Sequence, residues 1–230
     1  MEIINIKDQL PKISKKTSEA LKVLRTNIQL SGTDIKTIEF TSTFSNEGKT
    51  RTSFCLAISL AESGKKVLFL DCDLRNSKLI GKYKVPNTSK GLTQYLSGAC
   101  DYDDILNETD INNFDVIFSG PVPPNPAELL ESEEFSSLVD TYKPFYDYII
   151  VDTPPIGKVI DAVILASKCD GIIFVVGSGD TNTQALRKAK RQIEKTECRI
   201  LGAVLNKATN GKDLSYGGFS GYGSYGDYGK

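Results

Sequence analysis

The sequence predicts an α/β fold in which helices cover both faces of a mostly parallel sheet. Three observations support this class. Short runs rich in Val, Ile and Leu alternate with helical stretches along most of the 230 residues. These runs are continuously apolar, which is typical of parallel strands buried on both faces. Two of them end in aspartate, and ligands of parallel sheets bind at the carboxyl ends of the strands.

The predicted elements follow from the local sequence in chain order. The first substantial helix spans 18–31, because Ser18 can cap its start, leucine and isoleucine recur at helical spacing, and Gly32 follows its end. Gly64 and Pro126 mark the end of one later helix and the start of another. The predicted strands are 37–42, 65–71, 114–120, 146–152, 171–177 and 200–206. The predicted helices between them are 50–63, 91–97, 102–106, 126–140, 161–167 and 183–195.

The composition changes at about Ser215, so we predict a folded domain over 1–214 and a tail over 215–230. The tail reads SYGGFSGYGSYGDYGK, and such a glycine-rich segment cannot bury enough apolar surface to offset its ordering entropy. We therefore predict that it is disordered. It is either a sticky or solubilising low-complexity segment or a set of phenol substrates held on a tether. The phenols are those of Tyr216, Tyr222, Tyr225 and Tyr228.

Several classes of function are excluded by composition. The sequence contains no histidine, which rules out Ser-His-Asp and Cys-His catalysis and every His-ligated metal site. The net charge of −1 gives no general attraction to nucleic acid or to a membrane. The five cysteines are scattered and never spaced as C-x-x-C, so we expect free thiols in a reducing compartment. Without a signal-peptide pattern or an apolar run of ~18 residues, we expect a soluble protein.

The stretch TSTFSNEGKT, over 41–50, joins the first core strand to a helix. Its last three residues match the end of the phosphate-loop pattern G-x-x-x-x-G-K-[ST], although Thr43 stands at the opening glycine. Backbone N–H groups of such a loop converge on phosphate oxygens, the lysine places a positive charge on the phosphates, and the threonine hydroxyl ligates Mg²⁺. The alternative for the lysine is a solvated surface position. The predicted nucleotide-binding residues of the loop are Ser45, Asn46, Glu47, Gly48, Lys49 and Thr50.

Carboxylates follow two of the predicted strands, in VLFLDCDLR over 67–75 and YIIVDTPP over 148–155. One such carboxylate is often only a turn former. Here Asp71, Asp73 and Asp152 are predicted at the same edge of the sheet as the phosphate loop, and hard oxygen ligands there suit Mg²⁺ with a nucleotide. Arg75 either touches a phosphate or the acceptor, or forms an ordinary ion pair with a nearby carboxylate.

Taken together, these motifs resemble those of the bacterial tyrosine kinases. The D-x-D-x-R of residues 71–75 resembles their second, A-prime Walker motif, and S-N-E-G-K-T and I-I-V-D-T-P-P resemble their A and B motifs. GPVPPNPAELL (120–130), EALKVLRTNIQ (19–29) and the tyrosine-rich end also resemble family sequences. The similarity runs from about residue 18 to residue 230. Within the family it points to the capsule or exopolysaccharide tyrosine autokinases of Gram-positive bacteria.

The resemblance implies a P-loop (Walker-type) fold and an ATP-dependent autokinase that regulates capsular or exopolysaccharide synthesis and export. Lys49 and Thr50 would hold the phosphates of ATP and Mg²⁺. Asp71, Asp73 and Asp152 would act on Mg²⁺, its waters and the incoming tyrosine. The phosphate acceptors would be the four tyrosines of the tail. The implied catalytic residues are Lys49, Asp71, Asp73 and Asp152, and the implied metal ligands are Thr50 and the same three aspartates.

The resemblance also implies partners and a location. The activator would be a transmembrane adaptor of the polysaccharide co-polymerase type, and a cognate phosphotyrosine phosphatase would reverse the reaction. The kinase would be cytoplasmic and recruited to the inner face of the membrane through the adaptor. It would form a homo-oligomer, with a ring as one arrangement that the resemblance implies. Nucleic acid would not be a partner. Asn206 would meet adenine, or else is a turn asparagine.

Two positions depart from the family pattern. Ser45 stands where the family loop usually carries proline. The family's E-x-x-R-x-x-R segment, implicated in ring assembly, is here Glu19-x-x-Lys22-x-x-Arg25. Lysine cannot form the bidentate fork of arginine, so the sequence supports catalysis more strongly than ring formation.

The predicted reaction is transfer of the γ-phosphoryl of ATP to a tyrosine hydroxyl, with alignment and charge neutralisation supplying most of the rate. A carboxylate would take the phenol proton, with Asp71 as the first choice and Asp73 as the second. One alternative is a positioning ATPase of the ParA/MinD type, in which a lysine would stand at Phe44. Another is a non-catalytic, nucleotide-dependent scaffold.

Overall fold

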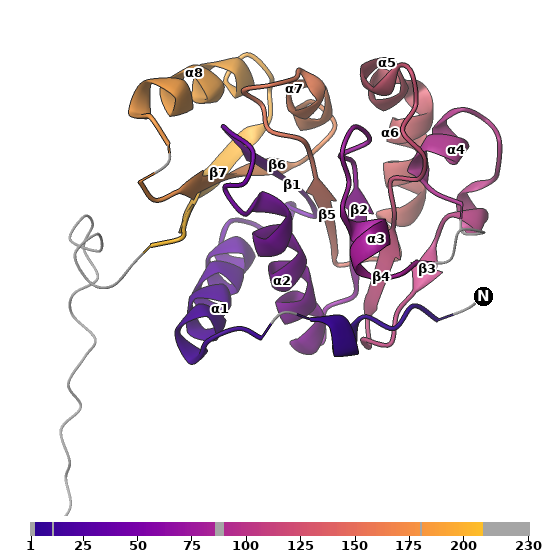
Figure 1. The fold of residues 1–230 in the computed structure, drawn as a ribbon, viewed down its shortest axis with the longest axis horizontal. Coiled ribbons are helices and arrows are strands. Elements are labelled where there is room, and N and C mark those ends of the chain that lie inside the picture. Colours follow the sequence, from indigo (N-terminus) through magenta and orange to yellow (C-terminus); the bar gives the residue numbers. More distant parts are fainter. Residues whose placement is uncertain (1–2, 11, 86–89, 180, 209–230) are drawn as a thin grey trace, which may run out of the picture.

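The computed structural model describes residues 3–10, 12–85, 90–179 and 181–208. These residues contain a seven-stranded sheet with the order β3-β4-β2-β5-β1-β6-β7 (Figure 1). Neighbouring strands are parallel except at one edge, where β3 runs antiparallel to β4. The predicted mostly parallel α/β fold is therefore confirmed. The predicted tail over 215–230, its tyrosines and the boundary after residue 214 lie outside the described residues.

The strands form where the sequence is continuously apolar, because the central ones are buried on both faces. The structure confirms each predicted strand to within a few residues at its ends. It adds β3, which the sequence did not predict, because two residues are too few to show a pattern. The strands are β1 (Thr37–Ser42), β2 (Val67–Asp71), β3 (Asn107–Glu108), β4 (Phe114–Ile117), β5 (Tyr148–Asp152), β6 (Gly171–Gly177) and β7 (Arg199–Asn206).

The helices differ from the prediction in four places. The first begins earlier than predicted, because Ser14 rather than Ser18 caps it: the Ser14 hydroxyl accepts from the backbone N–H of Thr17 at 3.1 Å. The single helix predicted over 126–140 is two helices, because Ser132 has an extended ψ of 160°. A short helix, α3, was not predicted. The short helix predicted over 102–106 is only a 3₁₀ turn over Tyr102–Asp104. The helices are α1 (Lys15–Leu30), α2 (Lys49–Glu62), α3 (Leu79–Lys82), α4 (Leu92–Leu96), α5 (Pro126–Glu131), α6 (Glu133–Tyr142), α7 (Asp161–Ala166) and α8 (Thr183–Ile193), with 3₁₀ turns η1 (Lys7–Gln9) and η2 (Tyr102–Asp104).

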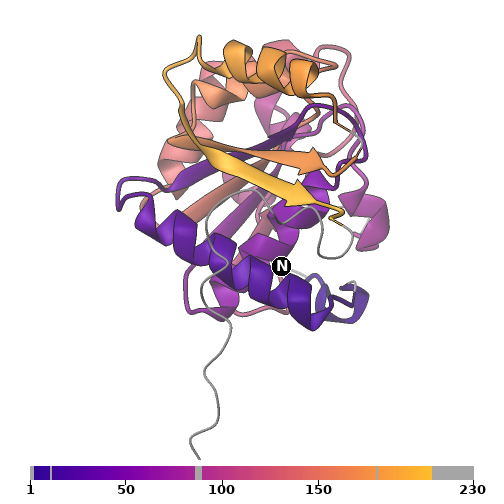
Figure 2. The same cartoon turned by 90° about the vertical axis from the view of Figure 1, so that its left-hand side faces the viewer.

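Helices cover both faces of the sheet, as predicted. One layer holds α1, α2 and α3, and the other holds α4 to α8; Figure 2 shows α1 and α8 on opposite faces beside the β7 edge. Successive strand residues alternate between the two cores. On β2, for example, Phe69 packs with the α1–α2 layer, whereas Leu68 and Leu70 pack with Phe135 and Leu138 of α6. Buried apolar side chains on both faces hold the strand ends at one edge in fixed positions.

The carboxyl edge of the sheet brings separate parts of the sequence together. Asp71 at the end of β2 is in register with Asp152 at the end of β5, and Asp152 is in register with Phe40 of β1. Just beyond β1, the chain forms the loop that opens α2. Asn206 ends β7, two strands away on the other side of this loop. The five cysteines are all free, and no helix in the described part of the chain is long and apolar enough to cross a bilayer.

Candidate functional site

The loop before α2 is closed by a contact with β7. Gly48 has a φ of 87° and is the N-cap residue of α2. The Asn206 amide Nδ2 donates to the carbonyl of Glu47 at 2.8 Å. A Cβ on Gly48 would lie 2.0 Å from the same nitrogen, so only glycine fits this left-handed position beside Asn206. The side chain of Asn206 therefore holds the loop in place at Glu47 and Gly48.

Glu47 braces the loop from inside. Its side chain is buried, and its Oε2 accepts from the backbone N–H of Phe44 at 2.7 Å. Its Oε1 accepts from the backbone N–H of Gly177 at 3.1 Å and from the Thr181 hydroxyl. Both carboxylate oxygens are therefore engaged within the protein. Only the backbone N–H of Glu47, and not its side chain, is therefore expected to bind phosphate.

Lys49 lies at the centre of the site with unused donors. Its side chain is 6% exposed, and its Nζ lies 2.9 Å from Oδ1 of Asp152. The two charges attract, but the contact lacks hydrogen-bond geometry, and Nζ has no hydrogen-bond acceptor among the described residues. A buried ammonium is costly unless its N–H groups find hydrogen-bond acceptors, and the ion pair with Asp152 does not supply them. This orphaned donor fits a phosphate group.

Asp152 gathers donors from the first turn of α2. Its Oδ2 accepts from the Thr50 hydroxyl at 2.7 Å, and its Oδ1 accepts from the Ser53 hydroxyl at 3.0 Å. Thr50 and Ser53 are three residues apart and so lie on the same helix face. Sequence reasoning missed Ser53, although its spacing from Thr50 was a usable signal. The hydroxyl of Thr50 and the carboxylate of Asp152 together offer hard oxygen atoms beside the lysine.

Asp71 and Asp73 lie beside this pair. Asp71 is 1% exposed, and its Oδ2 accepts from the Ser77 hydroxyl, a contact that the sequence did not predict. Burial raises the pKa of Asp71 to about 7, and the negative charge of Asp152 adds to this rise. Asp73 is half-buried and accepts from the backbone N–H of Asn76 at 3.1 Å; burial also raises its pKa. A carboxyl group with a raised pKa is suited to accept a proton.

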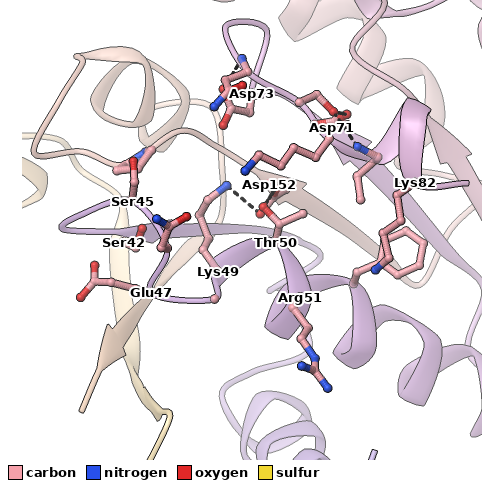
Figure 3. A pocket seen from close by; sticks show the side chains of 18 residues that line it. Ser42, Ser45, Glu47, Lys49, Thr50, Arg51, Asp71, Asp73, Lys82 and Asp152 are labelled. Atoms are coloured by element: carbon pink, nitrogen blue, oxygen red, sulfur yellow. Dashed lines mark hydrogen bonds and ion pairs between the residues drawn. The ribbon is translucent and has the colours of Figure 1, made fainter. Parts of the chain in front are cut away.

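One cavity of about 280 Å³ collects most of the predicted site residues (Figure 3). Figure 3 shows Lys49 and Thr50 pointing from α2 toward Asp152, with Asp71 and Asp73 on neighbouring segments. The predicted residues that line this cavity are Ser45, Asn46, Glu47, Gly48, Lys49, Thr50, Asp71, Asp73 and Asp152.

The described residues contain no group of three or more His, Cys, Asp or Glu side chains placed to hold a metal ion. The three aspartates therefore line one cavity without forming a cage. Mg²⁺ usually keeps several waters and is bound through one or two carboxylates and substrate phosphates. The hydroxyl of Thr50 and the carboxylate of Asp152, hydrogen-bonded at 2.7 Å, are placed to serve as oxygen ligands of a magnesium ion bound in this way.

Two predicted nucleotide-binding residues lie elsewhere. Arg75 is not among the cavity-lining residues, and its guanidinium forms two hydrogen bonds with the buried Asp161, Nε to Oδ2 at 2.8 Å and Nη2 to Oδ1 at 2.9 Å. The ion pair, which the sequence left as the alternative, is the arrangement that the structure contains. Asn206 also lies outside the lining, behind the loop, and a contact with adenine stays a prediction.

Comparisons with known proteins show what the chain is similar to. The AAA domain family matches residues 36–202. The tyrosine-protein kinase CpsD of Streptococcus agalactiae is 44% identical over 219 residues, which cover 95% of both chains. The kinase domain of the Escherichia coli tyrosine kinase ETK superposes with a TM-score of 0.80 at 32% identity, covering 86% of this chain and 78% of that one.

A more distant likeness concerns the alternative reading as a positioning ATPase. The septum site-determining protein MinD of Pyrococcus horikoshii, solved with Mg-ADP, superposes with a TM-score of 0.64 at 24% identity. It covers 74% of this chain and 70% of its own. At that identity the likeness shows a common fold and nothing about activity.

Proposed function

The chain belongs to the bacterial tyrosine-protein kinases, and from that membership we propose that the cavity beside Lys49 transfers the γ-phosphoryl of ATP to tyrosine hydroxyls. One observation carries the proposal. A buried ammonium without a hydrogen-bond acceptor lies in the same cavity as a carboxyl group whose pKa is raised to about 7. The first group suits an anionic phosphate and the second suits a phenol proton.

The proposed transfer balances as follows. The phenol oxygen forms a bond to the γ-phosphorus, the bond from that phosphorus to the bridging oxygen breaks, and ADP leaves. The phenol proton passes to the carboxylate of Asp71, with Asp73 as the second choice. Lys49 and the loop N–H groups hold and orient the phosphates, and Thr50 and Asp152 would hold the metal. When bound, Mg²⁺ supplies positive charge to the phosphates.

We propose that the acceptors are the four tyrosines of the tail. A flexible segment of sixteen residues would span roughly 20–25 Å on average, and we propose that it reaches the site of a neighbouring subunit or of its own. We further propose that a transmembrane co-polymerase-type adaptor activates the kinase at the inner face of the membrane. A phosphotyrosine phosphatase would reverse the reaction. The subunits would form a homo-oligomer. The product would regulate synthesis of a capsule or exopolysaccharide.

The test is autophosphorylation. The full chain is incubated with Mg-ATP, with and without the cytoplasmic segment of a candidate adaptor, and labelling is read with an antibody against phosphotyrosine. We expect labelling of the unaltered chain, none for Lys49→Met, and none for the variant with Tyr216, Tyr222, Tyr225 and Tyr228 changed to Phe. Full labelling of Lys49→Met would refute the site.

The same incubation separates the alternatives. A positioning ATPase would release phosphate without labelling itself. A non-catalytic scaffold would bind the nucleotide and do neither. Circular dichroism of each variant shows whether a loss of labelling reflects the site or a loss of the fold.

A further inference from the structure

The cavity extends to only one side of the phosphate loop. In the order β2-β5-β1-β6-β7, the ends of β2 and β7 lie on opposite sides of the loop that follows β1. The cavity runs past Asp71 at the end of β2 toward α3, and Asn206 at the end of β7 is outside its lining. If the base of the nucleotide lies on the Asn206 side, the part bounded by α2 and α3 is left for the acceptor.

That part of the cavity carries a basic rim, which we define as Arg51, Lys78 and Lys82. All three side chains line the cavity and are exposed to solvent. Figure 3 shows Arg51 on α2 and Lys82 on α3, on the far side of Thr50 from Glu47. The three residues therefore border the part of the cavity that lies next to α3.

The rim charges are not neutralised by the protein. Arg51, Lys78 and Lys82 make no ion pair with any residue that the structure describes, whereas Lys49 is paired with Asp152. Burial lowers the pKa of Lys82; the nearby Cys55 thiol opposes this shift, and the charge of Arg51 adds to it. The Lys82 ammonium lies over the Tyr83 ring at 4.9 Å from its centroid, a contact that adds no negative charge. Three like charges at one rim favour an anionic ligand.

We propose that the basic rim is an acceptor subsite that binds anionic groups next to the tyrosine being modified. This inference rests on the proposed function and adds a substrate class to it: acidic or already phosphorylated tyrosine segments. Its ligands would be a carboxylate or a phosphotyrosine close in sequence to the reacting phenol. The three rim residues act on specificity and touch neither the reacting atoms nor the metal.

The tail has the chemistry that such a rim selects. Its last three tyrosines follow one another at intervals of three residues, and Asp227 precedes the last of them, Tyr228. Each phosphate adds about −1.5 to −2 charges and three strong acceptor oxygens. A phosphate on Tyr225 would therefore favour binding of the segment with Tyr228 as the next acceptor. The consequence is that the first modification of a tail accelerates the later ones.

The test uses peptides of residues 221–230 in which Tyr228 is the only phenol that can react, with Tyr222→Phe in each. The first peptide carries phosphotyrosine at 225, the second Tyr225→Phe, and the third Tyr225→Phe with Asp227→Asn. The enzyme is the full chain with its four tail tyrosines changed to Phe, so that it cannot label itself. We expect KM to rise in that order, by about tenfold between the first and third peptides, with kcat little changed.

Variants of the rim decide the cause. In Lys78→Gln/Lys82→Gln the three KM values should converge, and in Lys78→Arg/Lys82→Arg the order should return because the charge is kept. The matched control is Lys15→Gln/Lys16→Gln, which removes two exposed charges from α1, away from the cavity. Equal KM values for the three peptides in the enzyme whose rim is intact would overturn the inference. It would also be overturned if the differences in KM disappeared equally in the α1 control.

Failure of the inference and failure of the proposed function give different results. If no peptide is labelled with or without the adaptor segment, the kinase proposal fails, and the subsite is then judged by binding alone. Fluorescence anisotropy of the labelled phosphopeptide, with Mg-ADP present, should show binding that the rim variant weakens about tenfold and that the α1 control leaves unchanged. Labelling with no effect of peptide charge leaves the kinase proposal standing and refutes the subsite.

Discussion

Asp71 and Asp152 occupy paired positions at the ends of neighbouring parallel strands, yet the protein surrounds them differently. Asp152 accepts from two hydroxyls of α2 and lies 2.9 Å from the ammonium of Lys49. Within the described part of the chain, Asp71 accepts from the hydroxyl of Ser77 alone, and its pKa is raised to about 7 by burial. One carboxylate is held by two hydroxyls and an ammonium, whereas its neighbour has a pKa raised into the neutral range and is suited to exchange a proton.

The first prediction concerns the pH dependence of stability in the nucleotide-free protein. The pKa of Asp71 is about 7 in the folded state, against about 3.9 for an aspartate in the unfolded chain. The folded state therefore binds the proton more tightly, so this group's contribution to stability is lost as pH rises from about 4 to about 7. Asp71→Asn, which cannot ionise, should raise the melting temperature more at about pH 8 than at about pH 5.

Its control is Asp140→Asn, which changes an exposed aspartate of α6. That variant should shift the melting temperature little and by the same amount at both pH values. Added Mg-ADP should shrink the advantage of Asp71→Asn, because the bound nucleotide and metal favour the charged form. An advantage of Asp71→Asn that is the same at both pH values would contradict the assignment of this proton.

A second prediction concerns the contact that closes the loop. Gly48→Ala places a Cβ 2.0 Å from the Asn206 amide and forces a positive φ on alanine, so it should weaken ADP binding strongly. Asn206→Ala removes the hydrogen bond to the Glu47 carbonyl and should cost about 1 kcal/mol of stability. In the double variant the clash is gone and only the backbone strain remains. The cost should therefore be less than the sum of the two single costs.

A double-mutant cycle measures this difference from unfolding in urea and from ADP titrations. The coupling should be on the order of 1 kcal/mol in favour of the double variant. Additive effects would mean that Asn206 is not pressed against the loop. A loss of adenine selectivity in Asn206→Ala, tested with GDP against ADP, would add support for the predicted base contact.

The sequence was informative about the site because its chemistry lies in local motifs. The loop from Ser45 to Thr50 and the aspartates that end β2 and β5 follow from strand–loop–helix patterns, and parallel strands bring such ends to one edge. The continuous apolar runs also gave the strands, because burial on both faces leaves little freedom of composition.

What the sequence could not give depends on contacts between distant segments. The hydrogen bond from Asn206 to Glu47 joins residues 159 positions apart, and the pair of Arg75 with Asp161 joins residues 86 apart. No local pattern reports such partners. The start of α1 at Lys15 was missed for another reason: Ser14 and Ser18 are both of a residue type that caps helices, and helix ends are uncertain by a few residues. The break at Ser132 is an extended backbone conformation without a side-chain cap, which no local pattern indicates.

A third prediction tests the structural role of Arg75. Arg75→Ala leaves the carboxylate of Asp161 buried without its partner and should cost about 1–3 kcal/mol, less than for a fully buried pair because the arginine is 37% exposed. Arg75→Ala/Asp161→Asn should recover most of that loss. ADP affinity should stay within about twofold in both variants. A drop in ADP affinity of more than about tenfold in Arg75→Ala alone would instead show that the arginine binds phosphate.

The fourth prediction separates two hydroxyls that contact the same carboxylate. Ser53 is fully buried and donates to Oδ1 of Asp152, so Ser53→Ala should cost about 1.5–3 kcal/mol of stability while leaving the Mg²⁺ dependence of ADP binding unchanged. Thr50 lines the cavity, and Thr50→Val should remove that dependence at a smaller cost in stability. Thr50→Ser keeps the hydroxyl and should retain the dependence. Calorimetric titration with ADP, with and without Mg²⁺, compares the metal dependence of ADP binding among these variants. If Ser53→Ala abolished that dependence as fully as Thr50→Val, the metal would not be held through Thr50.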